Sequence, residues 1–343
     1  MPVRKRKATT PPLASTPRRQ SGRAKRVQVV YAESDAECPA FSDDAEVSDE
    51  AEVDDYEEDA DMDEEAVTKS SAKGWRKVIL PNGNTQMEID IPTAKPAGDT
   101  PYEEGRIHQN TLEFLRELRR NNKREWLKFH DAVFRQAEKD FNSFITNLSS
   151  LLATYDPTLP DLPPRDLIHR IHRDMRFTPD PTPYKPYFSA SWSRAGRKGP
   201  YAHYYLHVQP GEDSFVGGGY FGCDNETLAC LREDVDTQPH QLKSVLMGEQ
   251  LRGVFFPTAQ GEERVVKAFC EMSKQNALKK KPKGFDADHK DIEILKLRNY
   301  VLTKKLSDKD VVGKNALQLI GSVMEALQPF ITYLNNTVMP DRN

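Results

Sequence analysis

Residues 187–221 decide the fold, and they read YFSASWSRAGRKGPYAHYYLHVQPGEDSFVGGGYF. This stretch contains three β-like runs, which are Tyr187–Arg194, Tyr201–Gln209 and Ser214–Phe221. Glycine and proline separate the runs, as they do in hairpin connections. An earlier run, Leu167–Phe177, predicts a fourth strand. Together the four runs predict one antiparallel sheet.

On both sides of these strands, apolar residues recur at the three- and four-residue spacing of helices. Before the strands, the spacing predicts a helix that Asn110 or Thr111 caps and Asn121-Asn122 closes, then a helix from Trp126 to Leu152. After them, it predicts helices over residues 227–235, 241–247, 262–275 and 317–334. Strands grouped between helices indicate an α+β fold, with one antiparallel sheet of about four strands packed with flanking helices. We expect a single domain over residues 101–343.

The N-terminal part has a different composition. Residues 1–31 contain basic residues and no acid, whereas residues 32–66 contain acids and no base, so the net charge of −4 averages two opposite segments. A charged segment with few apolar side chains cannot build a core, and we therefore expect a disordered tail over residues 1–70. Residues 71–100 are a predicted linker. Within it, Asn82-Gly83 between two β-prone runs predicts a hairpin.

Two basic clusters in residues 1–31 predict a nuclear localisation signal. Their side chains suit the acidic grooves of nuclear import receptors, and they also suit phosphate contacts with nucleic acid or chromatin. We expect nuclear localisation; a tail that only aids solubility is the alternative. The residues of the predicted nuclear signal are Arg4, Lys5, Arg6, Lys7, Arg18, Arg19, Lys25 and Arg26.

Hydropathy and cysteine usage exclude two other classes of protein. The mean hydropathy is −0.72, and no apolar run approaches the roughly 18 residues of a membrane span. The cysteines at positions 38, 223, 230 and 270 form no C-x-x-C pair and lack zinc-ligand spacing. We therefore expect free thiols of a reducing compartment, without a disulfide framework, a metal site or a membrane partner.

The predicted strands would gather polar side chains on one face of the sheet. Alternate residues of a strand share a face, so the polar residues at 170, 172, 174 and 176 would point the same way. Arginine offers paired donors and histidine a transferable proton, which favours a site for a phosphate or carboxylate. In the alternative, Asp174 neutralises Arg173 or Arg176 and braces the strand end. The candidate anion-binding residues are Arg170, His172, Asp174, Arg176, Tyr184, Lys185, His203 and His207.

The sequence gives less support to a zinc site, to nucleophilic catalysis, to a phosphate-binding loop and to nucleic-acid binding. His203 and His207 have zinc spacing only on a helix, because four residues of a strand span about 13 Å. No nucleophile motif occurs, and Gly217-Gly218-Gly219 lacks the Gly-Lys-Ser/Thr of a phosphate-binding loop. These glycines indicate close backbone approach or a bulge. Lys279–Lys283 suggests a nucleic-acid surface, but nearby acids favour a mixed solvated one. No cofactor is predicted.

Five short motifs carry a resemblance to a known family. They are Arg170–Phe177, Pro183-Tyr184-Lys185, Asn121–Trp126, Gly217–Gly219 and Pro282–Phe285. In these motifs the chain resembles domain of unknown function 2461, over roughly residues 108–335. The resemblance implies one domain and no particular activity. Pro181 stands where many members have lysine, so no role for that lysine carries over.

Two hypotheses follow. The first is a nuclear interaction or ligand-binding module with an anion-binding polar sheet face. The second is an enzyme acting on a phosphorylated or carboxylated small molecule.

Overall fold

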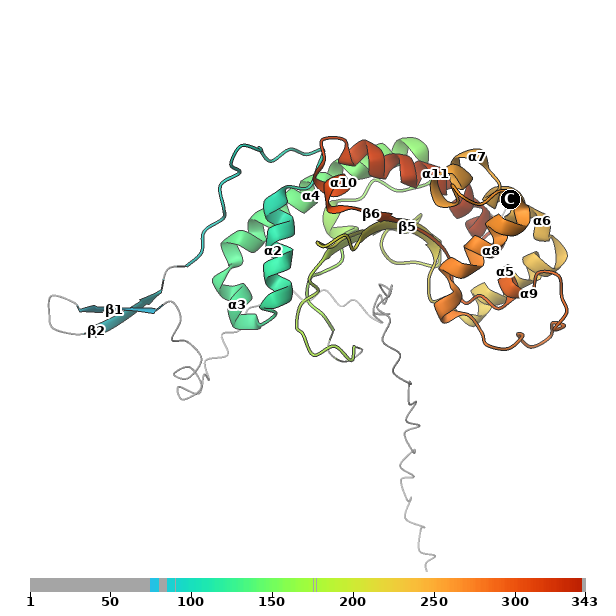
Figure 1. Ribbon diagram of the computed structural model, residues 1–343, viewed down its shortest axis with the longest axis horizontal. Helices are drawn as coiled ribbons and strands as arrows, with labels where there is room; N and C mark the ends of the chain where they lie inside the picture. The colour runs from blue at the N-terminus through green and yellow to red at the C-terminus, as the bar shows by residue number, and fades with distance from the viewer. Residues whose placement is uncertain (1–74, 80–84, 90, 175, 177, 341–343) are drawn as a thin grey trace, which may run out of the picture. The chain divides into compact units, whose positions relative to one another are not determined.

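The computed structural model in Figure 1 describes residues 75–79, 85–89, 91–174, 176 and 178–340. The predicted disordered tail over residues 1–70 lies outside these residues, and so does every residue of the predicted nuclear signal. Nuclear localisation, an import receptor as partner, and contact with chromatin or nucleic acid therefore stay predictions.

Two short strands lie in the predicted linker. β1 (Trp75–Ile79) pairs antiparallel with β2 (Thr85–Ile89), so that Trp75 stands opposite Ile89. This pairing is the one expected for a hairpin around Asn82-Gly83. The connecting residues 80–84 lie outside the described part.

The main sheet confirms the predicted α+β fold. Its strand order is β3-β4-β5-β6, and every neighbouring pair is antiparallel. β3 (Phe188–Trp192), β4 (His203–Val208) and β5 (Ser214–Tyr220) lie within the three predicted runs. The fourth strand is β6 (Tyr300–Leu306), which the sequence pattern did not predict.

The strand predicted over residues 167–177 is wrong. Among its described residues, this segment forms only two isolated bridges, Ile168 with Ala190 and His172 with Tyr184. It follows the edge of β3 for a few residues and then turns away, since the Lys185 N–H donates to the carbonyl of Ile171 at 2.8 Å. The segment changes its pairing partner too soon to form a strand.

The helices follow the predicted spacing, with three corrections. The first helix is capped by His108 and not by Asn110 or Thr111, because the His108 Nδ1 accepts the Asn110 N–H. The predicted helix over residues 126–152 is two helices that meet at His130. Three short helices, α7, α9 and α10, were not predicted. The bounds are α2 Gln109–Arg120, α3 Arg124–Phe129, α4 Asp131–Tyr155, α5 Asn225–Thr237, α6 Pro239–Leu246, α7 Glu249–Phe255, α8 Glu262–Met272, α9 Ile292–Leu295, α10 Asp308–Val312 and α11 Ala316–Val338, with 3-10 turns at Pro164–Asp166 and Lys274–Asn276. Within the described residues, no helix has the length and apolar character needed to cross a membrane.

Helices α4 and α11 cover one face of the sheet (Figure 1). On that face, the ring of Phe188 in β3 stacks on Phe141 of α4 at 5.1 Å between centroids. A Cβ built at Gly218 would lie 3.1 Å from Ile331 and 3.3 Å from Leu327 of α11. The absence of a side chain at Gly218 therefore lets α11 approach the sheet. This is the close approach that the glycine run predicts.

Candidate functional site

The opposite face of the sheet is polar and aromatic. Antiparallel residues that stand directly opposite share a face, and His207 of β4 stands between Ser189 of β3 and Phe215 of β5. Tyr205 stands opposite Ser191 in the same way. We call this surface the polar sheet face; its residues are Ser189, Ser191, His203, Tyr205, His207 and Phe215. The sheet therefore places its hydroxyls and imidazoles on the side that α11 leaves free.

His207 is the most enclosed titratable group on the polar sheet face. Its ring stacks on Phe215 at 4.7 Å and lies 4.1 Å from the ring of Tyr187. Its Nε2 bonds with the Oε1 of Gln209 at 3.2 Å. Burial lowers the pKa of His207 to about 4, and the nearby charge of Lys185 lowers it further. The imidazole is therefore neutral at pH 7.

Lys185 supplies a positive charge beside this neutral histidine. Lys185 as a residue is only 8 % exposed. Its backbone N–H donates a hydrogen bond to the carbonyl of Ile171, which fixes the backbone. The Lys185 ammonium forms no ion pair or hydrogen bond with any residue that the structure describes. A buried charge normally has a counter-ion, because removing it from water is costly. This charge is one that an anionic ligand would neutralise.

Sequence reasoning missed His169. Its Nε2 lies 3.0 Å from the Ser191 hydroxyl, and its ring centroid lies 6.0 Å from that of Tyr205. Strict alternation from Arg170 placed His169 on the apolar side, but the segment is not a strand. The Ser-x-Ser alternation in β3 was the available signal for this polar neighbourhood.

The predicted arginines converge on Asp174. The Asp174 carboxylate accepts bonds from the Nε and Nη2 of Arg176, at 3.0 and 2.8 Å, and from its backbone N–H at 3.0 Å. Arg170 lies 3.9 Å away on the same carboxylate. Arg173 instead pairs with Asp180 at 3.0 Å. These contacts support the structural alternative for Asp174 and Arg176.

The remaining candidates are dispersed. His172 is exposed, and its ring meets the edge of the buried Tyr184 ring at 5.2 Å. Asn122 holds the backbone of Tyr184 through both its amide oxygen and its amide nitrogen, at 3.0 and 2.8 Å. His203 shares the polar sheet face with His207 but starts β4, whereas His207 lies near its end. Of the predicted site, the structure therefore brings together two separate groups. One is Arg170, Asp174 and Arg176, which neutralise one another. The other is Lys185 and His207.

The Asp174–Arg176 pair has a measurable titration. Hydrogen bonds from Arg176 hold the pKa of Asp174 at about 2, below its ordinary 3.8. We expect Arg176→Ala to raise this pKa toward 3.8, as measured by NMR titration of the Asp174 carboxyl carbon. Because the folded pKa is lowered, the pair stabilises the fold above about pH 4 and loses its contribution as the pH falls toward 2.

Arg170→Ala is the control for this titration, since its guanidinium is farther from the carboxylate and contributes only a minor charge effect. A pKa of Asp174 that stays near 2 in Arg176→Ala would contradict the assignment.

In the described part of the chain, no group of three or more His, Cys, Asp or Glu side chains could hold a metal ion. The described cysteines, Cys223, Cys230 and Cys270, are free and half-buried. Burial raises the pKa of Cys223 to about 11 and that of Cys270 to about 12, so both are thiols at pH 7. They are poor nucleophiles.

Comparison with known proteins adds a family. Neither the curated proteins nor the solved structures contain a match. Among protein families, residues 110–333 match the conserved hypothetical proteins of DUF2461, the same family as the sequence motifs suggested. This match spans α2 to the last turns of α11 and includes the whole main sheet. The chain therefore belongs to the DUF2461 family of conserved hypothetical proteins.

Proposed function

We propose that the domain binds a small molecule bearing a phosphate or carboxylate, at the polar sheet face beside Lys185. The observation that carries the proposal is Lys185, a residue that is only 8 % exposed and whose ammonium has no counter-ion among the described residues. The hydroxyls of Ser189 and Ser191 lie in neighbouring positions of the same face. An anion there would neutralise the ammonium and accept hydrogen bonds from groups that are already in place.

Binding is better supported than acid–base catalysis at this site. A general base works best when its pKa lies near the working pH. The pKa of His207 is about 4, so its imidazole is a weak proton acceptor at pH 7 and is almost never protonated. His207 is therefore unsuited to act as the general acid or base of an enzyme at pH 7. A neutral imidazole remains suitable for a hydrogen bond to a ligand.

Lys185→Met tests the proposal. Inorganic phosphate and citrate are the probes, and the free energy of unfolding is measured by chemical denaturation at constant ionic strength. A bound anion at 100 times its Kd stabilises the folded state by about 2.7 kcal/mol. We expect at least one probe to stabilise the parent protein and neither to stabilise Lys185→Met. Without a probe, the variant should keep the stability of the parent, since Lys185 forms no ion pair with a described residue that the change would break.

Lys280→Met is the matched control, because it removes the same charge from an exposed position. It should respond to the probes as the parent does. Equal stabilisation of Lys185→Met and the parent would contradict the proposal, and so would a parent that neither probe stabilises. A large loss of stability in Lys185→Met without any probe would make Lys185 a structural residue.

A further inference from the structure

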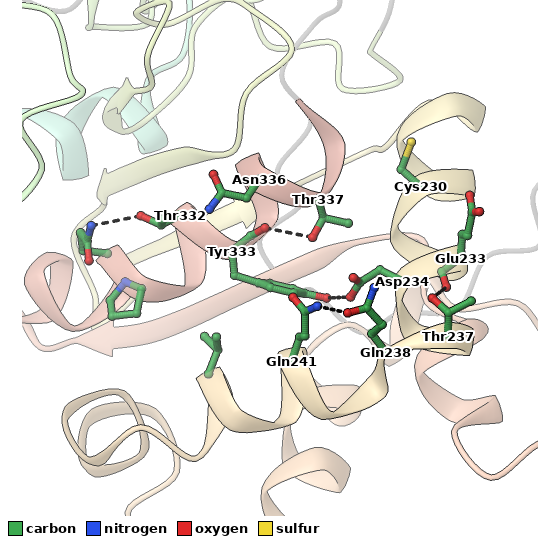
Figure 2. Close-up of a pocket in the computed structure, with 13 residues that line it drawn as sticks. Cys230, Glu233, Asp234, Thr237, Gln238, Gln241, Thr332, Tyr333, Asn336 and Thr337 are labelled. Carbon is green, nitrogen blue, oxygen red and sulfur yellow. Dashed lines mark hydrogen bonds between the residues drawn. The ribbon is translucent and has the colours of Figure 1, made fainter. Parts of the chain in front are cut away.

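A concave site that shares no residue with the polar sheet face lies between α5, α6 and α11. Figure 2 shows the side chains that line it. It is an open groove with a volume of about 790 Å³. The groove offers the side-chain amides of Gln238, Gln241, Gln328 and Asn336. A groove of this size is large enough for a small ligand or a short peptide segment.

The wall formed by α5 carries two carboxylates, Glu233 and Asp234. Asp234 accepts a hydrogen bond of 2.5 Å from the hydroxyl of Tyr333, which reaches across from α11 (Figure 2). Burial raises the pKa of Tyr333, and the bond to Asp234 raises it further, so the phenol keeps its proton. The Glu233 carboxylate has no ion-pair or hydrogen-bond partner among the described residues.

The charges of the groove are all of one sign. The described residues that line it include Glu233 and Asp234 and no lysine, arginine or histidine. The groove also combines these carboxylates with side-chain amide oxygens, and both kinds of oxygen accept hydrogen bonds. A ligand that is rich in donors and positively charged complements this surface, whereas an anion would be repelled.

We infer that the groove between α5, α6 and α11 binds an organic cation, either a protonated amine or a guanidinium. The cation contacts the carboxylates of Glu233 and Asp234, and the surrounding amides bind the polar remainder of the ligand. A free polyamine and an arginine or lysine side chain of a partner protein share this chemistry. The inference is independent of the proposed anion site, because the two sites share no residue and prefer opposite charges.

Spermidine and the capped tripeptide Ala-Arg-Ala distinguish the two sources, and capped Ala-Gln-Ala is the uncharged reference. The full chain is titrated with each probe while NMR follows the side-chain amides of Gln238, Gln241 and Asn336. This readout is specific for the groove, so cation binding to the acidic residues 32–66 does not enter it. We expect saturable shifts of these amides with at least one cationic probe and none with Ala-Gln-Ala.

Glu233→Lys is the decisive variant, because Glu233 is exposed and its replacement should leave the fold intact. This change should lower the affinity for the cationic probe by roughly tenfold or more, since an attraction becomes a repulsion. Glu226→Lys makes the same charge change on α5 outside the groove and should leave the affinity unchanged. Equal affinity of the two variants would overturn the inference, and so would shifts with Ala-Gln-Ala that match those of Ala-Arg-Ala. No saturable amide shift with either cationic probe would overturn it as well.

Discussion

We expect the variant Lys243→Met to have an unfolding free energy about 3–5 kcal/mol lower than that of the parent protein, because the change leaves a buried carboxylate without its counter-ion. The Lys243 ammonium of α6 lies 2.6 Å from Asp291, and the two side chains are only 9 % and 7 % exposed. Glu262 is the next carboxylate, at 3.9 Å and largely exposed. The loss should be measured by chemical denaturation.

Lys296→Met is the control for the buried pair. Lys296 contacts Glu293 at 2.7 Å, but these side chains are 24 % and 69 % exposed. An exposed pair contributes about 0–1 kcal/mol, so this variant should be nearly as stable as the parent. The double variant Lys243→Met/Asp291→Leu should regain much of the loss, since it leaves no buried charge. Similar losses in Lys243→Met and Lys296→Met would show that burial does not decide the contribution.

Gly219→Ala is the second change with a large expected effect. Gly219 has a φ of 131°, which side chains rarely adopt, and a Cβ there would lie 2.0 Å from the Tyr300 carbonyl oxygen of β6. Backbone strain of about 1–3 kcal/mol and overpacking of about 1–3 kcal/mol act together. We expect a loss of about 2–6 kcal/mol of unfolding free energy, or an unfolded variant. Thermal and chemical denaturation measure it.

Gly222→Ala separates the two causes. Gly222 also has a positive φ, of 62°, but nothing lies within 4 Å of a Cβ built there. Only the left-handed backbone is penalised, at about 1–2 kcal/mol. A loss in Gly219→Ala no larger than that in Gly222→Ala would mean that β6 can move away from β5 without cost.

The strands that could be predicted are those whose hairpin connections are local. β3, β4 and β5 follow one another, and glycines and prolines mark both connections. β6 could not be found in this way, because its partner β5 lies far back in the sequence and its own run contains two exposed lysines. Leu167–Phe177 has a strand-like pattern for a different reason. Leu167 and Ile171 are buried, but the backbone of the segment bonds two different partners.

Part of the candidate site could be predicted because it lies on one of these locally connected strands. His207 lies on a true strand, so alternation placed it correctly on the polar sheet face. Lys185 lies in a loop, and only the three-dimensional structure shows that it is buried close to His207. The arginines at 170 and 176 lie in the segment that is not a strand, where short-range bonds to Asp174 decide their positions. Sequence spacing carries no information about such a turn.

Because β6 lies far along the sequence from β5, the sheet cannot be completed until late in translation. β5 ends at Tyr220 and β6 begins at Tyr300, so the ribosome adds about 80 residues before the last strand exists. At about 5–20 residues per second this takes on the order of 4–16 s. Throughout that interval β5 is an open edge, and α11, which covers the sheet, is still untranslated. The nascent chain therefore depends on its own helices α5 to α9, or on a chaperone, to keep that edge from pairing with another chain.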